Sequence, residues 1–208
     1  MKSRLLGAFS AGIFLLGLVS TADAALVGRL PATPGGTNYQ AYYDTVLNIT
    51  WDANANRGAY NWNAGTAWAA NFTLGGITGW RLPSMDKNGD RVVLACTTAN
   101  AVACAADNEF GYLWAINGIT TTSPGPFSGV PTVGYSYWAS SAYSGDRYSN
   151  IRLDTGGQHG STVDRNLRVW AVKDGDVFAS TVVPIPAAIW LFGSGLLGLI
   201  GMAKRKKA

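Results

Sequence analysis

The sequence predicts an α+β domain with long loops, flanked by a targeting segment at each end. Two stretches of helical composition lie before residue 120, and several short strand-like runs separated by Gly and Asn turns follow them in the last third of the chain. No periodic pattern extends through the whole chain. The 208 residues include 26 Gly and eight Trp, and only 13% are charged, which suits an irregular core held together by aromatic side chains.

The N-terminus has the three parts of a secretory signal peptide. A basic start, "MKSR", precedes an apolar stretch over residues 5–19, and Ala22 and Ala24 occupy the small-residue positions of an A-x-A cleavage pattern. We expect signal peptidase to cut between Ala24 and Ala25 and so to remove residues 1–24. The remaining chain would be exported.

Residues 25–38 are rich in Pro and Gly and are expected to form a loose lead-in segment before a domain over residues 39–178. Residues 39–51 carry many aromatic and β-branched side chains, interrupted by Asp44 and Thr45. This pattern predicts two short strands joined by a tight turn.

Two helices are expected next. The Ala-rich stretch "WNAGTAWAANFTLGG" (62–76) predicts a helix that Asn63 or Thr66 could cap and that its Gly pair would end. The stretch "DNEFGYLWAING" (107–118) places two aromatic residues and a leucine at i, i+3 and i+4 spacing, which predicts a second short helix.

The last third of the chain is expected to form strands. A loop rich in Pro, Gly and Ser over residues 123–131 precedes "YSYWASSAY" (135–143), "YSNIRLDT" (148–155) and "LRVWAVKDGD" (167–176). His159, the single histidine, lies in "TGGQHGST", which looks like a hairpin tip. No nucleophile motif accompanies it, so a Ser-His-Asp hydrolase is not indicated.

The basic balance of the chain comes from its two ends. The formal net charge is +4, with 16 Lys and Arg against 12 Asp and Glu. Residues 25–181 hold ten Lys and Arg against eleven Asp and Glu. The exported part is therefore nearly neutral and offers no basic patch for nucleic acid.

Cys96 and Cys104 are the only cysteines, and they lie eight residues apart in a chain that we expect to be exported. An oxidising compartment favours a disulfide between them, closing a small loop. Two cysteines alone are a poor basis for a metal site.

The most metal-like segment is "DKNGDR", where Asp86, Asn88 and Asp90 repeat the D-x-N-x-D spacing that opens a calcium loop. Arg91 stands where such a loop needs Gly, and Thr97 stands where it needs Glu. The Asn-Gly dipeptide is also a strong tight-turn signal. We therefore expect a turn, with calcium as the alternative and no other cofactor.

The C-terminal segment predicts a membrane span. Residues 187–203 are uncharged, and as a helix of about 1.5 Å per residue they would extend roughly 26 Å, close to the hydrocarbon thickness of a bilayer. The basic tail over residues 204–208 is expected to stay in the cytoplasm, with the domain outside. Residues 179–186 link the two.

This end of the chain resembles the PEP-CTERM sorting signals that exosortases process. The lead-in motif matches the VPxPA form at Val183, Pro184, Ile185, Pro186 and Ala187, and the apolar span and the basic tail follow in the usual order. The resemblance implies a precursor held in the inner membrane of a Gram-negative bacterium. An exosortase would then cut it, leaving the mature form at the cell surface or outside, in association with exopolysaccharide and biofilm matrix.

The middle of the chain also has a resemblance. "YDTVLNITW", "WNAGTAWAANFTLGGITGWRLPS", "NEFGYLW", "GPFSG", "YWASSAY" and "RVWAVKDGD" occur in the order seen in the Lcl C-terminal domain family, with Ala139 inside the usual Tyr-Trp-Ser-Ser pattern. The resemblance covers residues 39–177. It implies a C-type-lectin-like fold, with two short helices, a twisted antiparallel sheet and long loops, and it carries over no catalytic residue set.

Together these observations predict a non-enzymatic binding or adhesion protein for exopolysaccharide or another matrix polymer. Its contact residues are expected in the late loops, around Tyr143, Tyr148 and His159. Two alternatives stay open. One is a purely structural matrix protein, and the other is a glycan-acting enzyme, which needs converging carboxylates. The candidates for that pair are Asp146, Asp154 and Asp164.

Overall fold

The structure is a computed structural model, and it describes residues 26–178, which we call the body. The predicted signal peptide with its cleavage site, the sorting motif, the membrane span and the basic tail lie outside the described residues. Within the body, no helix combines the length and the apolar composition that crossing a membrane requires.

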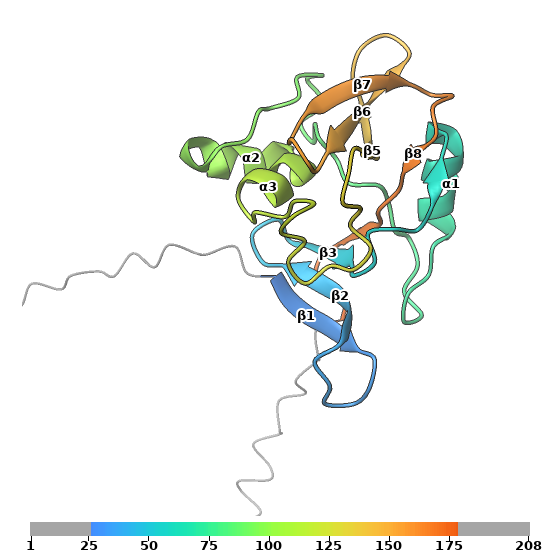
Figure 1. The fold of residues 1–208 in the computed structure, drawn as a ribbon, viewed down its shortest axis with the longest axis vertical. Helices are drawn as coiled ribbons and strands as arrows, with labels where there is room; N and C mark the ends of the chain where they lie inside the picture. The colour runs from blue at the N-terminus through green and yellow to red at the C-terminus, as the bar shows by residue number, and fades with distance from the viewer. Residues whose placement is uncertain (1–25, 179–208) are drawn as a thin grey trace, which may run out of the picture.

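The body is an α+β domain with two curled sheets (Figure 1). The first sheet is antiparallel, in the order β1-β2-β3-β9, and it holds both ends of the body together. Its strands are β1 (Leu26–Pro31), β2 (Tyr39–Asp44), β3 (Ile49–Asp52) and β9 (Val172–Asp174).

The second sheet has the order β4-β8-β5-β6-β7 and lies at the other end of the body (Figure 1). All its pairs are antiparallel except β5 with β8, which meet in parallel where Tyr137 is opposite Arg168. Its strands are β4 (Ala59–Tyr60), β5 (Ser136–Ala142), β6 (Arg147–Arg152), β7 (Gln158–Thr162) and β8 (Leu167–Arg168).

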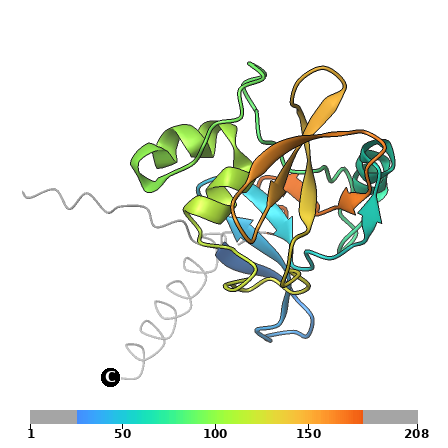
Figure 2. The same cartoon turned by 45° about the horizontal axis from the view of Figure 1, so that its top comes forward.

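Short helices flank these sheets on two sides. In both ribbon views α1 lies on one side of the body, and α2 and α3 lie together on the other (Figures 1 and 2). The elements are α1 (Trp62–Asn71), a 3-10 turn η1 (Thr98–Asn100), α2 (Ala101–Asp107) and α3 (Glu109–Ala115).

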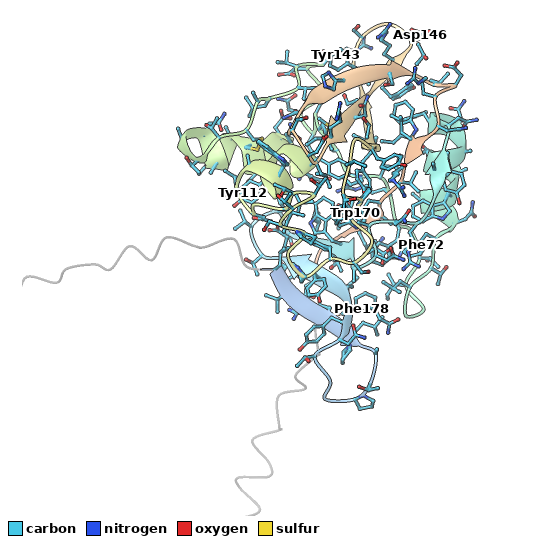
Figure 3. The ribbon with its side chains drawn as sticks, viewed as in Figure 1. Phe72, Tyr112, Tyr143, Asp146, Trp170 and Phe178 are labelled. Atoms are coloured by element: carbon cyan, nitrogen blue, oxygen red, sulfur yellow. A yellow bond between two sulfur atoms is a disulfide. The ribbon has the colours of Figure 1, made fainter. Side chains whose placement is uncertain are left out.

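An aromatic cluster fills the main core. The Trp170 ring lies centrally in the body (Figure 3) and meets the ring of Phe127 at 4.8 Å and that of Trp51 at 5.2 Å between centroids. The Trp170 indole nitrogen donates to the backbone oxygen of Asp52 at 2.7 Å. The prediction of a core held together by aromatic side chains is confirmed, since Trp51, Trp80, Trp138 and Trp170 are all buried.

The predicted hairpin near the N-terminus is confirmed. β2 ends at Asp44 and β3 begins at Ile49, and the Asp44 carboxylate accepts hydrogen bonds from the backbone of Val46 and Leu47 at 3.0 and 2.9 Å. A short acidic side chain is suited to this turn because it can bond the backbone that follows it.

The predicted disulfide is confirmed as well. Cys96 and Cys104 are bonded, with 5.5 Å between their Cα atoms, and the bridge ties α2 to the preceding loop. Gly111 of α3 passes so close that a Cβ at this position would lie 2.6 Å from the Cys96 sulfur. The glycine in "NEFGYLW" is therefore needed for the packing of α3 against the bridge.

Several expectations were wrong in detail. Residues 25–38 are not all loose, because Leu26–Pro31 form β1 against β2. Two sheets replace the single one, and α2 lies where no helix was expected. The helix α1 is capped by Asn61, whose side chain accepts from the backbone of Ala64, rather than by a later residue.

The last expected strand and the expected hairpin tip were also misjudged. The run 167–176 is broken into β8 and β9, which belong to different sheets. His159 lies inside β7, opposite Asn150, and the turn before it spans residues 153–155. The alternation of Gly and polar residues around His159 reflects an exposed edge strand, since β7 ends the sheet order.

Candidate functional site

An ion pair with a fully buried carboxylate lies between the helix α3 and the "GWRLPS" segment. Glu109, the only glutamate of the chain, opens α3 and is 0% exposed. Arg81 holds its carboxylate with two bonds, from Nη1 to Oε2 at 2.8 Å and from Nη2 to Oε1 at 2.7 Å. This two-bond geometry matches the planar guanidinium to the carboxylate and is the strongest form of such a pair.

Backbone and hydroxyl groups complete the site. The backbone N–H of Ser84 donates to Glu109 Oε2 at 2.7 Å, and the backbone N–H of Glu109 donates to the Ser84 carbonyl at 2.9 Å. The hydroxyls of Ser84 and Ser141 lie 2.9 Å apart, and Ser140 donates its backbone N–H to Pro83 at 2.8 Å. Three segments distant in the sequence, "WRLPS", "NEFGYLW" and "YWASSAY", therefore meet in one hydrogen-bond network.

A polar pocket of about 510 Å³ opens over this network. We call it the Arg81 pocket. Asp174 on its rim accepts from Arg81 Nη2 at 2.5 Å, and the Lys87 ammonium lies 3.7 Å from Glu109 Oε1. Asn48 and Ser140 add an amide and a hydroxyl to the lining. Both cations of this pocket therefore face carboxylates.

Arg81 and Asp174 both have pKa values shifted away from neutral pH. Burial alone would lower the pKa of Arg81, but the hydrogen bonds and charges of Glu109 and Asp174 outweigh it and raise that pKa. The hydrogen bond from Arg81 lowers the pKa of Asp174, and burial opposes it only in part. Both groups stay charged across the physiological range.

The chemistry of the Arg81 pocket is that of hydrogen bonding. Guanidinium, ammonium and serine groups supply donors, and carboxylate and amide oxygens supply acceptors. Its described lining contains neither His nor Cys. Such a set of fixed donors and acceptors suits a ligand rich in hydroxyl groups.

The three residues predicted to contact a ligand are not brought to one surface. Tyr148 stacks on Trp62 of α1, with 3.5 Å between ring centroids, and the β6–β7 register places His159 on the same sheet face. Tyr143 packs on the opposite face, where a Cβ on Gly160 would collide with its ring. Tyr143 sits at the far end of the body beside Asp146 (Figure 3).

Of the three aspartates considered for a glycan-acting enzyme, two lie at one end of the β6–β7 strand pair and the third lies at the other end. Asp146 precedes β6 and Asp164 follows β7, and the pairing of Arg147 with Thr162 places both at one end of that strand pair. Asp154 follows the other end of β6 and is bound by Arg152.

The "DKNGDR" segment forms a tight turn. The Asp86 carboxylate accepts from the backbone N–H groups of Gly89, Asp90 and Arg91 at 2.8, 3.1 and 2.9 Å. The Asn88 carbonyl oxygen accepts from Asp90 as well. The carboxylates of Asp86 and Asp90 therefore serve to stabilise the turn through hydrogen bonds to backbone N–H groups. Within residues 26–178, no three His, Cys, Asp or Glu side chains group closely enough to hold a metal ion.

Sequence reasoning missed the Arg81 pocket, although a signal was present. A single glutamate at the start of an apolar helix must either face water or meet a cation, and the neighbouring aromatic and aliphatic residues make burial the better expectation. The choice of Arg81 as its partner could not be deduced, because 28 residues separate the two.

The comparisons with known proteins add no relative. Protein family models, curated protein sequences and solved structures all give no match to this chain.

Proposed function

We propose that the chain is an exported, non-enzymatic binding protein for a matrix polysaccharide and that the Arg81 pocket is its binding site. The main support for this proposal is that hydrogen-bond donors and acceptors held in fixed positions line one pocket. They belong to Arg81, Lys87, Asn48 and Asp174. Because Arg81 is already held by two carboxylates, a ligand meets a preorganised surface and little ordering cost remains on binding.

The family assignment belongs to this proposal. We propose that the body is an Lcl C-terminal domain with C-type-lectin-like architecture. Support comes from three of the segments that carry the resemblance, which meet in the hydrogen-bond network around Glu109 and so have a common physical role. Because these segments build one hydrogen-bond network, we expect them to be retained among members of the family even where the sequence between the segments varies.

Sorting and processing also belong to the proposal. The signal peptide would deliver the chain to the inner membrane, and an exosortase would cut near Pro186 and leave the mature form at the cell surface or outside. Mass spectrometry of the mature protein tests this step. A C-terminal peptide that retains the basic tail would contradict it.

The binding proposal is tested with the full chain, purified in a detergent that carries no sugar headgroup. Retention on beads bearing the host exopolysaccharide is compared for the native chain and for the Lys87→Ala and Asp174→Ala variants. We expect each variant to weaken retention about tenfold, because each loses a rim group that can bond a hydroxyl.

A matched control is Asp146→Ala, an exposed acid at the far end of the body (Figure 3). It should be retained like the native chain. Equal retention of all four proteins would overturn the assignment of the pocket, and no retention of the native chain on any extracted polymer would overturn the proposed function itself.

A further inference from the structure

A second pocket, of about 240 Å³, lies between β4, β8 and the start of β5. We call it the Arg168 pocket, and it shares no lining residue with the Arg81 pocket. Its side chains of interest are Tyr135, Arg165 and Arg168. With about 30 Å³ for each water of the liquid, it holds roughly eight waters, which is room for one sugar ring.

The two arginines of this pocket lack carboxylate partners. Neither Arg165 nor Arg168 forms an ion pair with any residue of the body. Arg168 donates through Nη1 to the Asn56 side chain, a neutral acceptor, and its buried Nε has no hydrogen-bond partner within the body. Their positive charge is therefore available to a ligand.

Nearby acids form no ion pair with these two arginines. Asp164 is bonded by the Thr162 side chain and attracts Arg165 only at longer range. Asp154, beside Gly134, is already held by Arg152 through two bonds at 3.0 and 2.5 Å. The pocket keeps a positive character although the body as a whole is nearly neutral.

Tyr135 supplies an aromatic surface beside the charges. The Arg168 guanidinium carbon lies 4.2 Å from the centre of its ring, a cation–π contact that holds the two side chains together. The tyrosine is nevertheless 51% exposed. An exposed ring next to free guanidinium groups can contact a flat apolar face while the cations bind an acidic group.

From this combination we infer that the Arg168 pocket binds the carboxylate of a uronic acid unit in an acidic polysaccharide. Arg165 and Arg168 bind the carboxylate, and Tyr135 packs against the sugar ring. The inference rests on the proposed function, polysaccharide binding, and adds that the body distinguishes acidic from neutral sugar units at a second site.

The test is calorimetric titration of the full chain, in the same sugar-free detergent, with trigalacturonate and with its methyl ester. The ester keeps the rings and removes the charge. We expect the acid to bind at least about tenfold more tightly than the ester, with an affinity that falls as salt is raised.

The variants Arg165→Ala and Arg168→Ala should each lose this preference for the acid. Arg165 is exposed, so its variant should fold even if that at Arg168 does not. Arg147→Ala is the matched control, since Arg147 is an exposed arginine without an ion pair in the body, at the opposite end of β6 from the strand end next to this pocket. It should keep the preference.

The outcomes separate this inference from the proposed function. If the chain is retained on exopolysaccharide but binds acid and ester equally, or if both pocket variants keep the preference, the uronate site is wrong and the binding function stands. Competition by inorganic polyphosphate at equal charge concentration would also overturn it, because the pocket would then bind polyanions of any kind. Failure of retention removes the proposed function independently.

Discussion

The two pockets of the body use arginine in opposite ways. In the Arg81 pocket the guanidinium is 31% exposed as a side chain and is held by two carboxylates, one of them fully buried. In the Arg168 pocket the guanidinium meets a neutral amide and an aromatic ring. A cation paired inside the fold supports the structure and fixes the donors of its pocket in place, and a cation without a carboxylate is free to neutralise a charged ligand. This contrast decides which variants should change stability and which should change binding.

The largest expected effect on stability comes from breaking the ion pair between Arg81 and Glu109. Arg81→Ala leaves the buried Glu109 carboxylate with the Ser84 backbone N–H as its hydrogen-bond donor and with the Lys87 ammonium, 3.7 Å away, as its nearest cation. The free energy of unfolding should therefore fall by about 3–5 kcal/mol. Urea denaturation followed by tryptophan fluorescence measures this. Arg165→Ala should change the free energy of unfolding by less than about 0.5 kcal/mol. Comparable losses in the two variants would contradict the claim that the two pockets use arginine differently.

A second effect concerns the support of the Arg81 pocket. Replacing both Cys96 and Cys104 by serine frees the loop packed against α3, whose first residue is Glu109. For a bridge that closes a loop of this size, the free energy of unfolding should fall by about 2–3 kcal/mol. Reduction of the native chain should reproduce the loss in a denaturation curve. Acid preference at the Arg168 pocket should survive in the variant if the two pockets are independent.

A third effect concerns the pH dependence of the paired side. The folded-state pKa of Asp174 is lowered by Arg81, so its contribution to stability is present above the unfolded pKa and is lost as pH falls through the folded pKa. Because Asp174 is 74% exposed, the contribution should be at most about 1 kcal/mol. Urea midpoints measured from pH 7 down to pH 2 should fall less for Asp174→Asn than for the native chain. Parallel curves would contradict this.

The smallest effect concerns a buried acid without a cation. Burial raises the pKa of Asp44, and within the body its carboxylate meets only backbone N–H groups and the Asn117 amide. A raised folded pKa means that stability is lost as pH rises through it. Asp44→Asn should remove that loss and change the free energy of unfolding by less than about 1 kcal/mol at pH 7.

The geometry allows this replacement. The side-chain oxygen of Asn117, Oδ1, has no hydrogen-bond partner within the body. The Asn117 side chain can therefore turn over, so that Oδ1 accepts from the side-chain amide that Asp44→Asn introduces. Denaturation at pH 5 and pH 8 is the measurement. A loss of several kcal/mol in Asp44→Asn would show that the negative charge itself is needed.

The sequence was most informative where the physics is local. The Asp44 turn, the helix with the i, i+3, i+4 spacing and the strand β5 follow from side chains within a few residues of one another, and all three were predicted. The disulfide was predicted from two cysteines in a chain that we expect to enter an oxidising compartment. In the turn, the helix and the strand, the interacting residues are neighbours in the sequence. In the disulfide, each cysteine has no other cysteine to pair with.

The rest depended on long-range partners. The run 167–176 has the composition of one strand, but it splits because Arg168 pairs with β4 and β5 while Val172 pairs with Trp51 of β3. Arg81 and Arg168 look alike in the sequence, and only the fold brings a glutamate to one and an asparagine to the other. Tyr143 does not join Tyr148 and His159 because successive residues of a strand lie on opposite faces of the sheet, and Tyr143 packs on the face of Gly160 rather than on that of His159.

The bridge between Arg29 and Asp176 has a mechanical consequence. The Arg29 guanidinium binds Asp176 through Nε at 2.8 Å and Nη2 at 2.6 Å, so the segment after β9 is fastened to β1. A force that reaches the body through residue 178 meets this bridge before the three residue pairs of β9 and β3. Load is then shared with β1 and β2 instead of peeling β9 alone from the sheet.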